Sequence, residues 1–102
     1  MEEKRQHRRV PLQIPVTLHV AGQEPYEAIA VDLSFGGMNI IDSQIRRYGE
    51  QVIVEVLLPG QTKTVRLPST VRWNNSAGFG VQFGLLGARE THVVTRLVSA
   101  AP

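Results

Sequence analysis

The chain has 102 residues, a formal net charge of +2 and no cysteine. This length fits a single domain, expected to span residues 1–102, and the lack of cysteine excludes disulfides and thiolate metal sites. The histidines His7, His19 and His92 share no metal-ligand spacing, so no metal or other cofactor is expected. The N-terminus has no signal-peptide pattern, and no stretch approaches the roughly 18–20 apolar residues of a spanning helix. We therefore expect a cytoplasmic domain without membrane insertion.

The excess positive charge is confined to the N-terminus. Residues 1–9 hold four of the eleven Lys and Arg side chains and two of the nine Asp and Glu side chains, so the rest of the chain is neutral. A domain that binds duplex nucleic acid usually presents a broader basic face. The compact basic segment is better suited to a small anion, and no nucleic-acid partner is expected.

Alternating apolar residues predict strands over most of the chain. We expect them at residues 14–20, 26–33, 38–41, 51–58, 62–74 and 78–83. In the second strand, Ile29, Val31 and Leu33 are expected to share one face. Residues 42–49 are polar and are expected to hold one helical turn, with Ser43 as its cap. Because proline cannot donate to a ladder, Pro68 predicts an edge, a bulge or a break.

The last part of the chain shows a helical period instead. Val93, Val94, Leu97 and Val98 recur at helical spacing and predict an amphipathic helix over residues 88–99. Its apolar stripe needs a cover. The predicted fold is therefore all-β, a small antiparallel barrel of about six strands with one C-terminal α-helix covering one end.

Two short motifs carry the candidate chemistry. The first is Arg5-x-x-x-Arg9, which follows Lys4 and contains Arg8. The second is Asp32-Leu33-Ser34-Phe35-Gly36-Gly37, at the end of the second predicted strand. Taken alone, the first is compatible with a solvated tail. The second is compatible with an ordinary turn in which glycine supplies a positive φ.

In this order and spacing the motifs resemble the signatures of the PilZ family, the cyclic di-GMP receptors of bacteria. The family pattern is R-x-x-x-R just before the first strand and D/N-x-S-x-x-G after the second. Val71-Arg72-Trp73 and Gly80-Val81-Gln82-Phe83 are similar to later strands of the family. The resemblance spans nearly the whole chain and implies a single-domain, non-catalytic receptor whose ligand is cyclic di-GMP.

The side chains suit such a ligand. A guanidinium grips phosphate in a bidentate manner, pairs with guanine O6 and N7, or stacks on a base. Asp32 is an acceptor for guanine N–H groups, Ser34 offers a hydroxyl, and bare glycine backbone permits close approach of a ring or phosphate. Trp73 either packs against a base or is an ordinary barrel residue. The expected ligand-binding residues are Arg5, Arg9, Asp32, Ser34 and Gly37, with Lys4, Arg8, Gly36 and Trp73 as further candidates.

One position departs from the family. A second arginine often stands directly before the first arginine of the motif, where this chain has Lys4. Lysine is a point charge that neither forks nor stacks well. The affinity, and whether one or two cyclic di-GMP molecules bind, are therefore left open.

Placement of the arginines suggests a mechanism. Residues 1–10 form an arginine-rich segment that we expect to be flexible without ligand and ordered by it, which would create a new surface for an unidentified downstream protein. The chain is expected to be a monomer. The main alternative is a nucleotide-independent protein-interaction adaptor of the PilZ type, and a nucleic-acid-binding small barrel is a weaker one.

Catalysis is not expected. Ser34 lies in no G-x-S-x-G elbow. Gly78-Phe79-Gly80 begins like a dinucleotide fingerprint, but Phe83 stands in place of the third glycine.

Overall fold

Six strands and one helix make up the described part of the chain, residues 8–100 of a computed structural model. Their bounds are β1 (Val10–His19), β2 (Tyr26–Leu33), β3 (Gly37–Ile41), β4 (Gln51–Val56), β5 (Val65–Asn74), β6 (Gly78–Phe83) and α1 (Ala88–Ala100). Lys4 and Arg5 lie outside the described residues. Across residues 8–100, no helix is long and apolar enough to cross a membrane.

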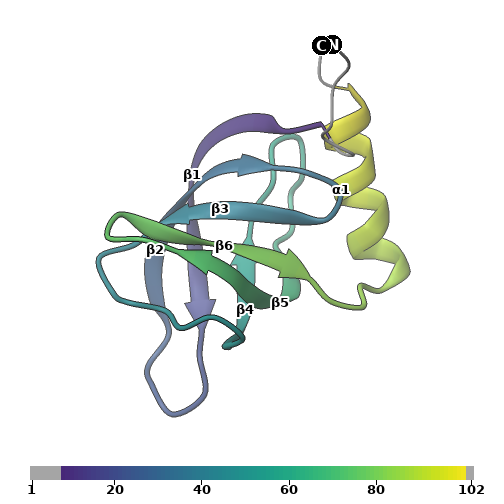
Figure 1. Cartoon of the computed structure of the whole chain (residues 1–102). Coiled ribbons are helices and arrows are strands. Elements are labelled where there is room, and N and C mark those ends of the chain that lie inside the picture. Colours follow the sequence, from purple (N-terminus) through teal and green to yellow (C-terminus); the bar gives the residue numbers. More distant parts are fainter. Residues whose placement is uncertain (1–7, 101–102) are drawn as a thin grey trace, which may run out of the picture.

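The strands close into an antiparallel barrel in the order β1-β2-β3-β6-β5-β4, with β4 pairing back onto β1 (Figure 1). The prediction of a small all-β barrel of about six strands with a C-terminal helix is confirmed. Closure gives each of these strands a hydrogen-bonded neighbour on both sides, so none of them is a sheet edge along its whole length.

Period-two alternation correctly identified the inner face of most strands. In β1, Val16 and Leu18 are buried and the residues between them are partly exposed. The same alternation buries Val52, Val54 and Val56 in β4. Phe79 and Val81 of β6 complete the interior. Each fully buried aliphatic or aromatic side chain stabilises the fold by about 1.5–3 kcal/mol, before the entropy of ordering it is subtracted.

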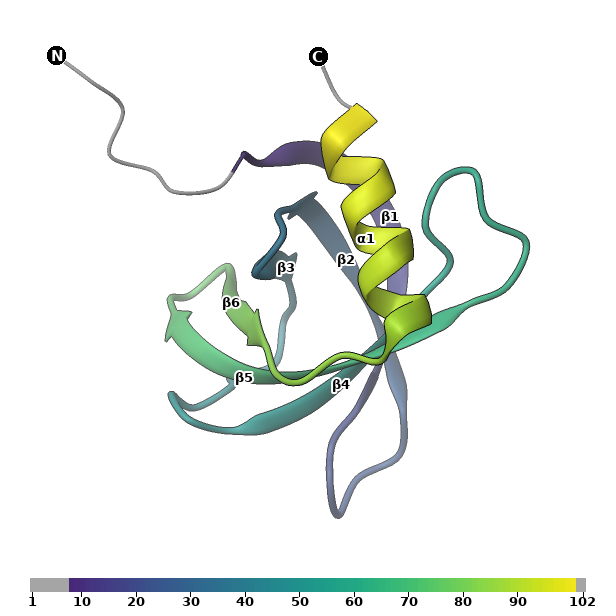
Figure 2. The ribbon, with the colours of Figure 1, turned by 90° about the vertical axis from the view of Figure 1, so that its right-hand side faces the viewer.

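Helix α1 lies across part of the barrel opening, in front of the strands in Figure 2. Its buried residues are Val93, Val94 and Val98, which belong to the same apolar cluster as the barrel interior. The predicted helix over residues 88–99 is confirmed and extends to Ala100. The barrel opening thus covers the apolar stripe of the helix.

The inner face of β2 differs from the prediction. Ile29 is 36% exposed and Val31 only partly buried, whereas Ala28 and Ala30 are buried. Leu33 is fully buried, as expected. The sequence pattern favoured the larger side chains, but the interior at this strand is filled by alanines.

A β-bulge at Val31 explains why Leu33 nevertheless points inward. Ala30 pairs with Ile40 and Asp32 pairs with Asn39, so two steps along β2 match one step along β3. Without the extra residue, Asp32 would share the inner face with Ala30. The bulge turns Asp32 outward instead.

Of the edge, bulge or break expected at Pro68, the structure shows an edge-like position, because pairing of β5 with β6 begins only at Ser69. Strand β5 continues through Pro68, which pairs with Ile53 of β4. The Pro68 carbonyl accepts a hydrogen bond of 2.7 Å from the Gly84 amide, just beyond the end of β6. A strand residue directs its N–H and C=O to the same side, so the side of Pro68 that lacks an N–H faces Gly84. This position lies beyond the end of the β5–β6 ladder, where no strand residue requires that donor.

The helical turn expected within residues 42–49 is also absent. This segment is an irregular loop held by a buried polar cluster. The hydroxyl of Tyr26 donates to Asp42 Oδ2 at 2.5 Å, and the guanidinium of Arg46 donates to Glu50 at 3.0 Å and to Gln44 at 2.9 Å. These side-chain hydrogen bonds hold the loop in place of helical backbone bonds, although Arg46 Nε is buried without a hydrogen-bond partner among residues 8–100.

Removing the Tyr26 hydroxyl is expected to destabilise the protein in a pH-dependent way. Burial, and after it the hydrogen bond to Asp42, raises the pKa of Tyr26 above its ordinary value. A raised pKa in the folded state stabilises the fold below about pH 10, and this contribution is lost as the pH rises further. Tyr26→Phe should cost about 1–3 kcal/mol at pH 8, measured by urea unfolding, because Asp42 loses a donor.

The difference between the wild-type chain and Tyr26→Phe should shrink above about pH 10. Tyr48→Phe, at an exposed tyrosine, is the control and should leave the free energy of unfolding nearly unchanged. An equal cost for Tyr26→Phe at pH 8 and pH 11 would contradict the assigned role of the hydroxyl.

Candidate functional site

A single row of paired residues crosses four strands on the outer face of the barrel. Asp32 of β2 pairs with Asn39 of β3, Asn39 pairs with Gly80 of β6, and Gly80 pairs with Trp73 of β5. Residues far apart in the sequence therefore lie side by side. The row thus connects Asp32, at the end of β2, to Trp73 of β5 through Asn39 and Gly80.

A second bulge turns Trp73 outward. Val71 is buried and pairs with Val81, while Trp73 pairs with Gly80, so Arg72 is an extra residue in β5. Strict alternation from Val71 would direct Trp73 into the barrel. With the bulge, its side chain is 43% exposed.

The Trp73 indole lies across Gly80. A Cβ atom at Gly80 would collide with indole Nε1 of Trp73 and would come within 2.6 Å of Asn39 Oδ1. Only glycine leaves room for the indole at this point of the outer face. The indole of Trp73 thus lies over the outer face of β6 and remains partly exposed.

Asp32 organises the other end of the row. Its Oδ1 accepts a 2.9 Å hydrogen bond from the Asn39 amide, and its Oδ2 accepts one of 2.7 Å from Asn39 Nδ2. The guanidinium of Arg9 lies 3.3 Å from Oδ1, with the side chains 39% and 18% exposed respectively. One carboxylate therefore fixes both an amide side chain and the arginine that precedes β1.

The turn between β2 and β3 is closed by Ser34. Its hydroxyl donates to the Gly37 carbonyl at 3.3 Å and accepts from the Gly37 amide at 3.1 Å, and the residue is 3% exposed. The Ser34 amide also donates to the Gly37 carbonyl. The hydroxyl is therefore engaged in shaping the turn, as the ordinary-turn interpretation of this motif implies.

The expectation that this turn needs a glycine with positive φ is wrong. Neither Gly36 nor Gly37 has a positive φ. Gly37 is required for a different reason, since a Cβ there would collide with the Val81 carbonyl oxygen of β6. At Gly36 a Cβ would meet no atom within 4 Å, so the free side of Gly36 faces open space.

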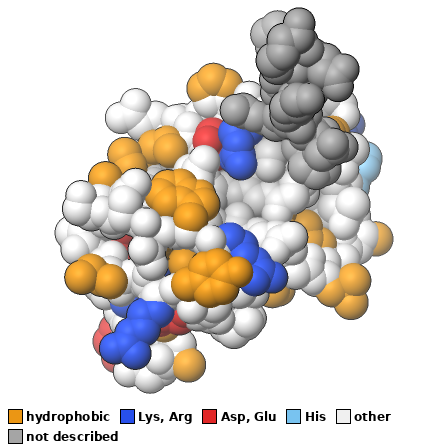
Figure 3. Space-filling model, in the orientation of Figure 1, with side chains coloured by type: hydrophobic (Ala, Val, Ile, Leu, Met, Phe, Trp, Pro, Cys, Tyr) orange, Lys and Arg blue, Asp and Glu red, His pale blue; other side chains and the backbone are white. Residues whose placement is uncertain are grey.

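These residues surround a cavity of about 240 Å³. Of the sequence-predicted site residues, the structure brings together Arg9, Ser34, Gly36, Gly37 and Trp73 at this cavity, with Asp32 behind Arg9. Arg8 is exposed and does not line it. Figure 3 shows basic side chains on both sides of a pale hollow on this face, with an acidic side chain beside one of them.

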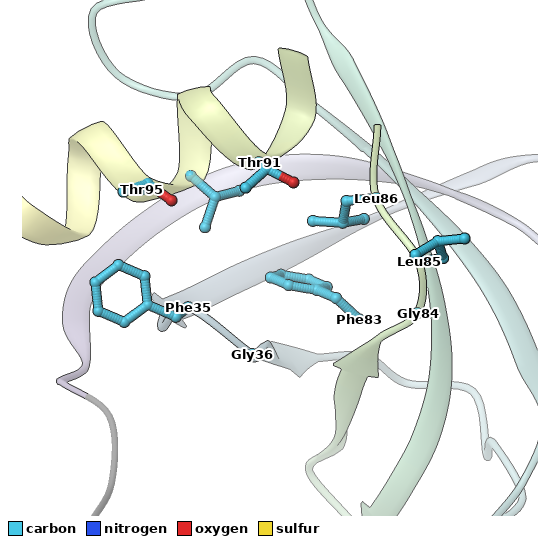
Figure 4. A pocket seen from close by; sticks show the side chains of 9 residues that line it. Phe35, Gly36, Phe83, Gly84, Leu85, Leu86, Thr91 and Thr95 are labelled. Atoms are coloured by element: carbon cyan, nitrogen blue, oxygen red, sulfur yellow. The ribbon is translucent and has the colours of Figure 1, made fainter. Parts of the chain in front are cut away.

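A larger hollow lies between the same turn and α1, but its chemistry is different. It measures about 340 Å³ and is lined by Phe35, Gly36, Phe83, Gly84, Leu85, Leu86, Thr91, Val94 and Thr95. Figure 4 shows the rings of Phe35 and Phe83 facing the helix residues Thr91 and Thr95. Among residues 8–100, no charged side chain lines this hollow, whereas two arginines line the smaller cavity, and we assign the candidate site to the smaller cavity.

Sequence reasoning missed three polar residues of the cavity. Asn39, Arg72 and Gln82 line it together with the predicted residues. Asn39 and Gln82 stand at outward positions of short apolar strands, where alternation marks a residue only as solvent-facing. Their proximity depends on the register of β3, β5 and β6, which no local signal in the sequence specifies.

The fold is a small closed β-barrel with a cavity on its outer face that is lined by two arginines, Arg9 and Arg72. The sequence matches the family model described as "PilZ domain" over residues 3–100. The chain therefore belongs to the PilZ family, a family of cyclic di-GMP-binding proteins. PilZ domains are non-catalytic receptors, which confirms the prediction that the chain is not an enzyme.

Solved structures of PilZ proteins share this fold. The PilZ domain of CeSA from a cellulose-synthesizing bacterium is 23% identical, with a TM-score of 0.73 over 90% of this chain and 95% of that one. The PilZ domain of YcgR from Escherichia coli, determined with c-di-GMP, is 13% identical, with a TM-score of 0.75 over 96% and 91%. The inhibitor of motility MotI/DgrA of Bacillus subtilis is 18% identical, with a TM-score of 0.79 over 96% of this chain and 51% of that one. No curated protein matches the chain.

Proposed function

We propose that this chain binds cyclic di-GMP in the outer-face cavity and acts in the cytoplasm as a receptor that passes the signal to a partner protein. The observation that carries the proposal is the pairing of Arg9 with Asp32 at the rim of a cavity whose floor is bare glycine backbone and whose wall is the Trp73 indole. Family membership supports the choice of ligand.

The geometry suits a dianion that carries two purines. Arg9 supplies a guanidinium for a phosphate or for guanine O6 and N7, and Asp32 keeps that guanidinium at the rim. Gly36 leaves open space in which a flat ring can approach the backbone, whereas the backbone at Gly80 is covered by the Trp73 indole. The exposed face of Trp73 is a stacking surface for a base, a contact worth about 1–3 kcal/mol per base in single-strand complexes.

We also propose how binding is transmitted. Arg9 stands directly before β1, so a ligand that engages it also engages the segment that carries Arg5 and Lys4. Closing residues 1–10 over the cavity would change the surface offered to a partner protein. Limited proteolysis with and without cyclic di-GMP tests this step, and protection of bonds within residues 1–10 by the ligand is the expected result.

Calorimetric titration of the wild-type chain with cyclic di-GMP tests the binding itself, and Asp32→Asn tests the site. The exchange keeps the shape of the side chain but removes the charge that pairs with Arg9 and replaces an acceptor of Asn39 by a donor. We expect binding roughly tenfold weaker or worse, because charge-assisted hydrogen bonds contribute about 1.5–3 kcal/mol.

The matched control is Glu27→Gln, which removes a carboxylate from an exposed position of the same strand. It should leave the affinity unchanged. Equal affinities for wild-type, Asp32→Asn and Glu27→Gln chains would show that the ligand binds elsewhere.

A nucleotide-independent protein adaptor is the second candidate. Ile45 and Leu85 are 83% and 97% exposed, and such apolar side chains on loops favour protein contacts. A wild-type chain that does not titrate with cyclic di-GMP but still forms a complex with a partner would establish this reading in place of the first.

A further inference from the structure

Arg72 is a second basic residue at the outer-face cavity. It lines the same cavity as Arg9, on the opposite side of the row, next to Trp73. The bulge in β5 makes Arg72 the extra residue of that strand and leaves Arg72 and Trp73 both exposed at consecutive positions. A cation and an aromatic ring are thus presented together.

The guanidinium of Arg72 is held in place from two sides. Its Nε donates a 2.7 Å hydrogen bond to Gln82 Oε1 on the neighbouring strand β6, and its Nη1 lies 3.5 Å from the hydroxyl oxygen of Tyr48. Its Cζ also lies 5.9 Å from the centre of the Tyr48 ring, within reach of a cation–π contact. These contacts restrain a side chain that is otherwise exposed.

The loop of residues 42–50 is tied to β5 where it presents Tyr48. The Gly49 amide donates to the Val71 carbonyl at 2.8 Å, and the Val71 amide donates to the Glu50 carbonyl at 2.9 Å. Gly49 has a φ of +87°, which lets the chain turn directly after Tyr48. The tyrosine that restrains Arg72 is therefore itself fixed by backbone hydrogen bonds.

Arg72 also keeps its charge unpaired within residues 8–100. Arg9, Arg46 and Arg66 each lie within 4 Å of a carboxylate, whereas the partners of Arg72 are an amide oxygen, a phenol oxygen and a ring. Neutral partners orient a guanidinium without neutralising it. An oriented, unneutralised guanidinium at a cavity is suited to an anion or to the acceptor edge of a guanine.

We propose that Arg72 binds the nucleotide in the outer-face cavity, contacting a phosphate or the O6/N7 edge of a guanine, and that Tyr48 and Gln82 are positioning residues for its guanidinium. This inference rests on the proposed function, since it places a second cation on the cyclic di-GMP site. The ligand is then gripped from both rims, by Arg9 from the start of β1 and by Arg72 from β5.

Calorimetry with cyclic di-GMP tests the role of Arg72. Arg72→Ala should bind roughly tenfold more weakly, the loss of about one charge-assisted contact. Arg72→Lys should recover only part of that loss, because an ammonium carries its donors on one nitrogen and cannot present the planar fork by which a guanidinium bonds Gln82 and the ligand at once. The matched control is Arg66→Ala on the same strand, whose side chain is 60% exposed and lies against Glu55.

A double-mutant comparison tests the positioning role of Tyr48. Tyr48→Phe, which keeps the ring, should stay close to wild type, while Tyr48→Leu should weaken binding. The loss for Tyr48→Leu should disappear when Arg72 is already alanine, because Tyr48 acts through Arg72. Independent, additive losses would overturn that assignment.

The outcomes separate this inference from the function on which it rests. If the wild-type chain binds and Arg9→Ala does not, but Arg72→Ala binds like wild type and folds normally, Arg72 is not a ligand residue and the proposed function stands. If the wild-type chain does not titrate at all, both proposals are overturned.

Discussion

Arg9→Ala is expected to bind cyclic di-GMP at least roughly 100-fold more weakly than the wild-type chain, which removes the signal in a calorimetric titration. Arg9 supplies the guanidinium that lies 3.3 Å from Asp32 at the cavity. Its loss deprives the ligand of a cation and leaves the Asp32 carboxylate facing the phosphates. Two unfavourable changes thus result from one substitution.

The fold of Arg9→Ala should be intact. Arg9 precedes β1 and its side chain is 39% exposed, so circular dichroism and the unfolding temperature should match those of the wild-type chain. Arg66→Ala, which removes an arginine that does not line the cavity, should bind normally. Wild-type affinity in Arg9→Ala would place the binding site outside the cavity described above.

Gly37→Ala is expected to destabilise the whole protein by about 1–3 kcal/mol or more, since overpacked side chains force backbone shifts. A Cβ at Gly37 would collide with the Val81 carbonyl, which lies in the neighbouring strand β6 of the closed barrel. Urea unfolding measures the loss. Because the shift would also disturb the turn that borders the cavity, the folded fraction should bind cyclic di-GMP weakly.

Two matched glycine variants separate stability from binding. Gly36→Ala meets no atom within 4 Å and should unfold like the wild-type chain, yet its methyl group would stand where the ligand approaches and should weaken binding. Gly78→Ala would collide with the Ile40 carbonyl between the same two strands, away from the cavity, and should destabilise the fold while its folded fraction still binds. A Gly37→Ala variant as stable as Gly36→Ala would contradict the close contact of β3 and β6.

Much of the fold was predictable because burial alternates with a period of two along β1 and β4. The errors concentrate where the period breaks. Around Val31 an apolar residue occupies the bulge, so the sequence shows no polar interruption that would reveal it. The loop after β3 was mistaken for a helical turn because Asp42 and Arg46 are held by Tyr26 and Gln23, which are distant in sequence, and not by helical backbone bonds.

Only those residues of the candidate site that belong to the two sequence motifs could be predicted. Arg9, Asp32 and Gly37 were singled out from the two signatures, and the structure places them around one turn. Arg72 and Asn39 belong to neither of these two motifs. They join the site through the pairing of β2 with β3 and of β5 with β6, and pairing between strands is a non-local property that a single sequence leaves open.

Because of the bulges at Val31 and Arg72, the candidate site residues and the core residues occupy different positions of the same strands. Asp32 and Trp73 face solvent, while Leu33 and Val71 fill the interior. Substitutions in the outward set can therefore accumulate during evolution with little penalty in thermodynamic stability. A barrel of this kind can change its ligand, or lose it, and still fold.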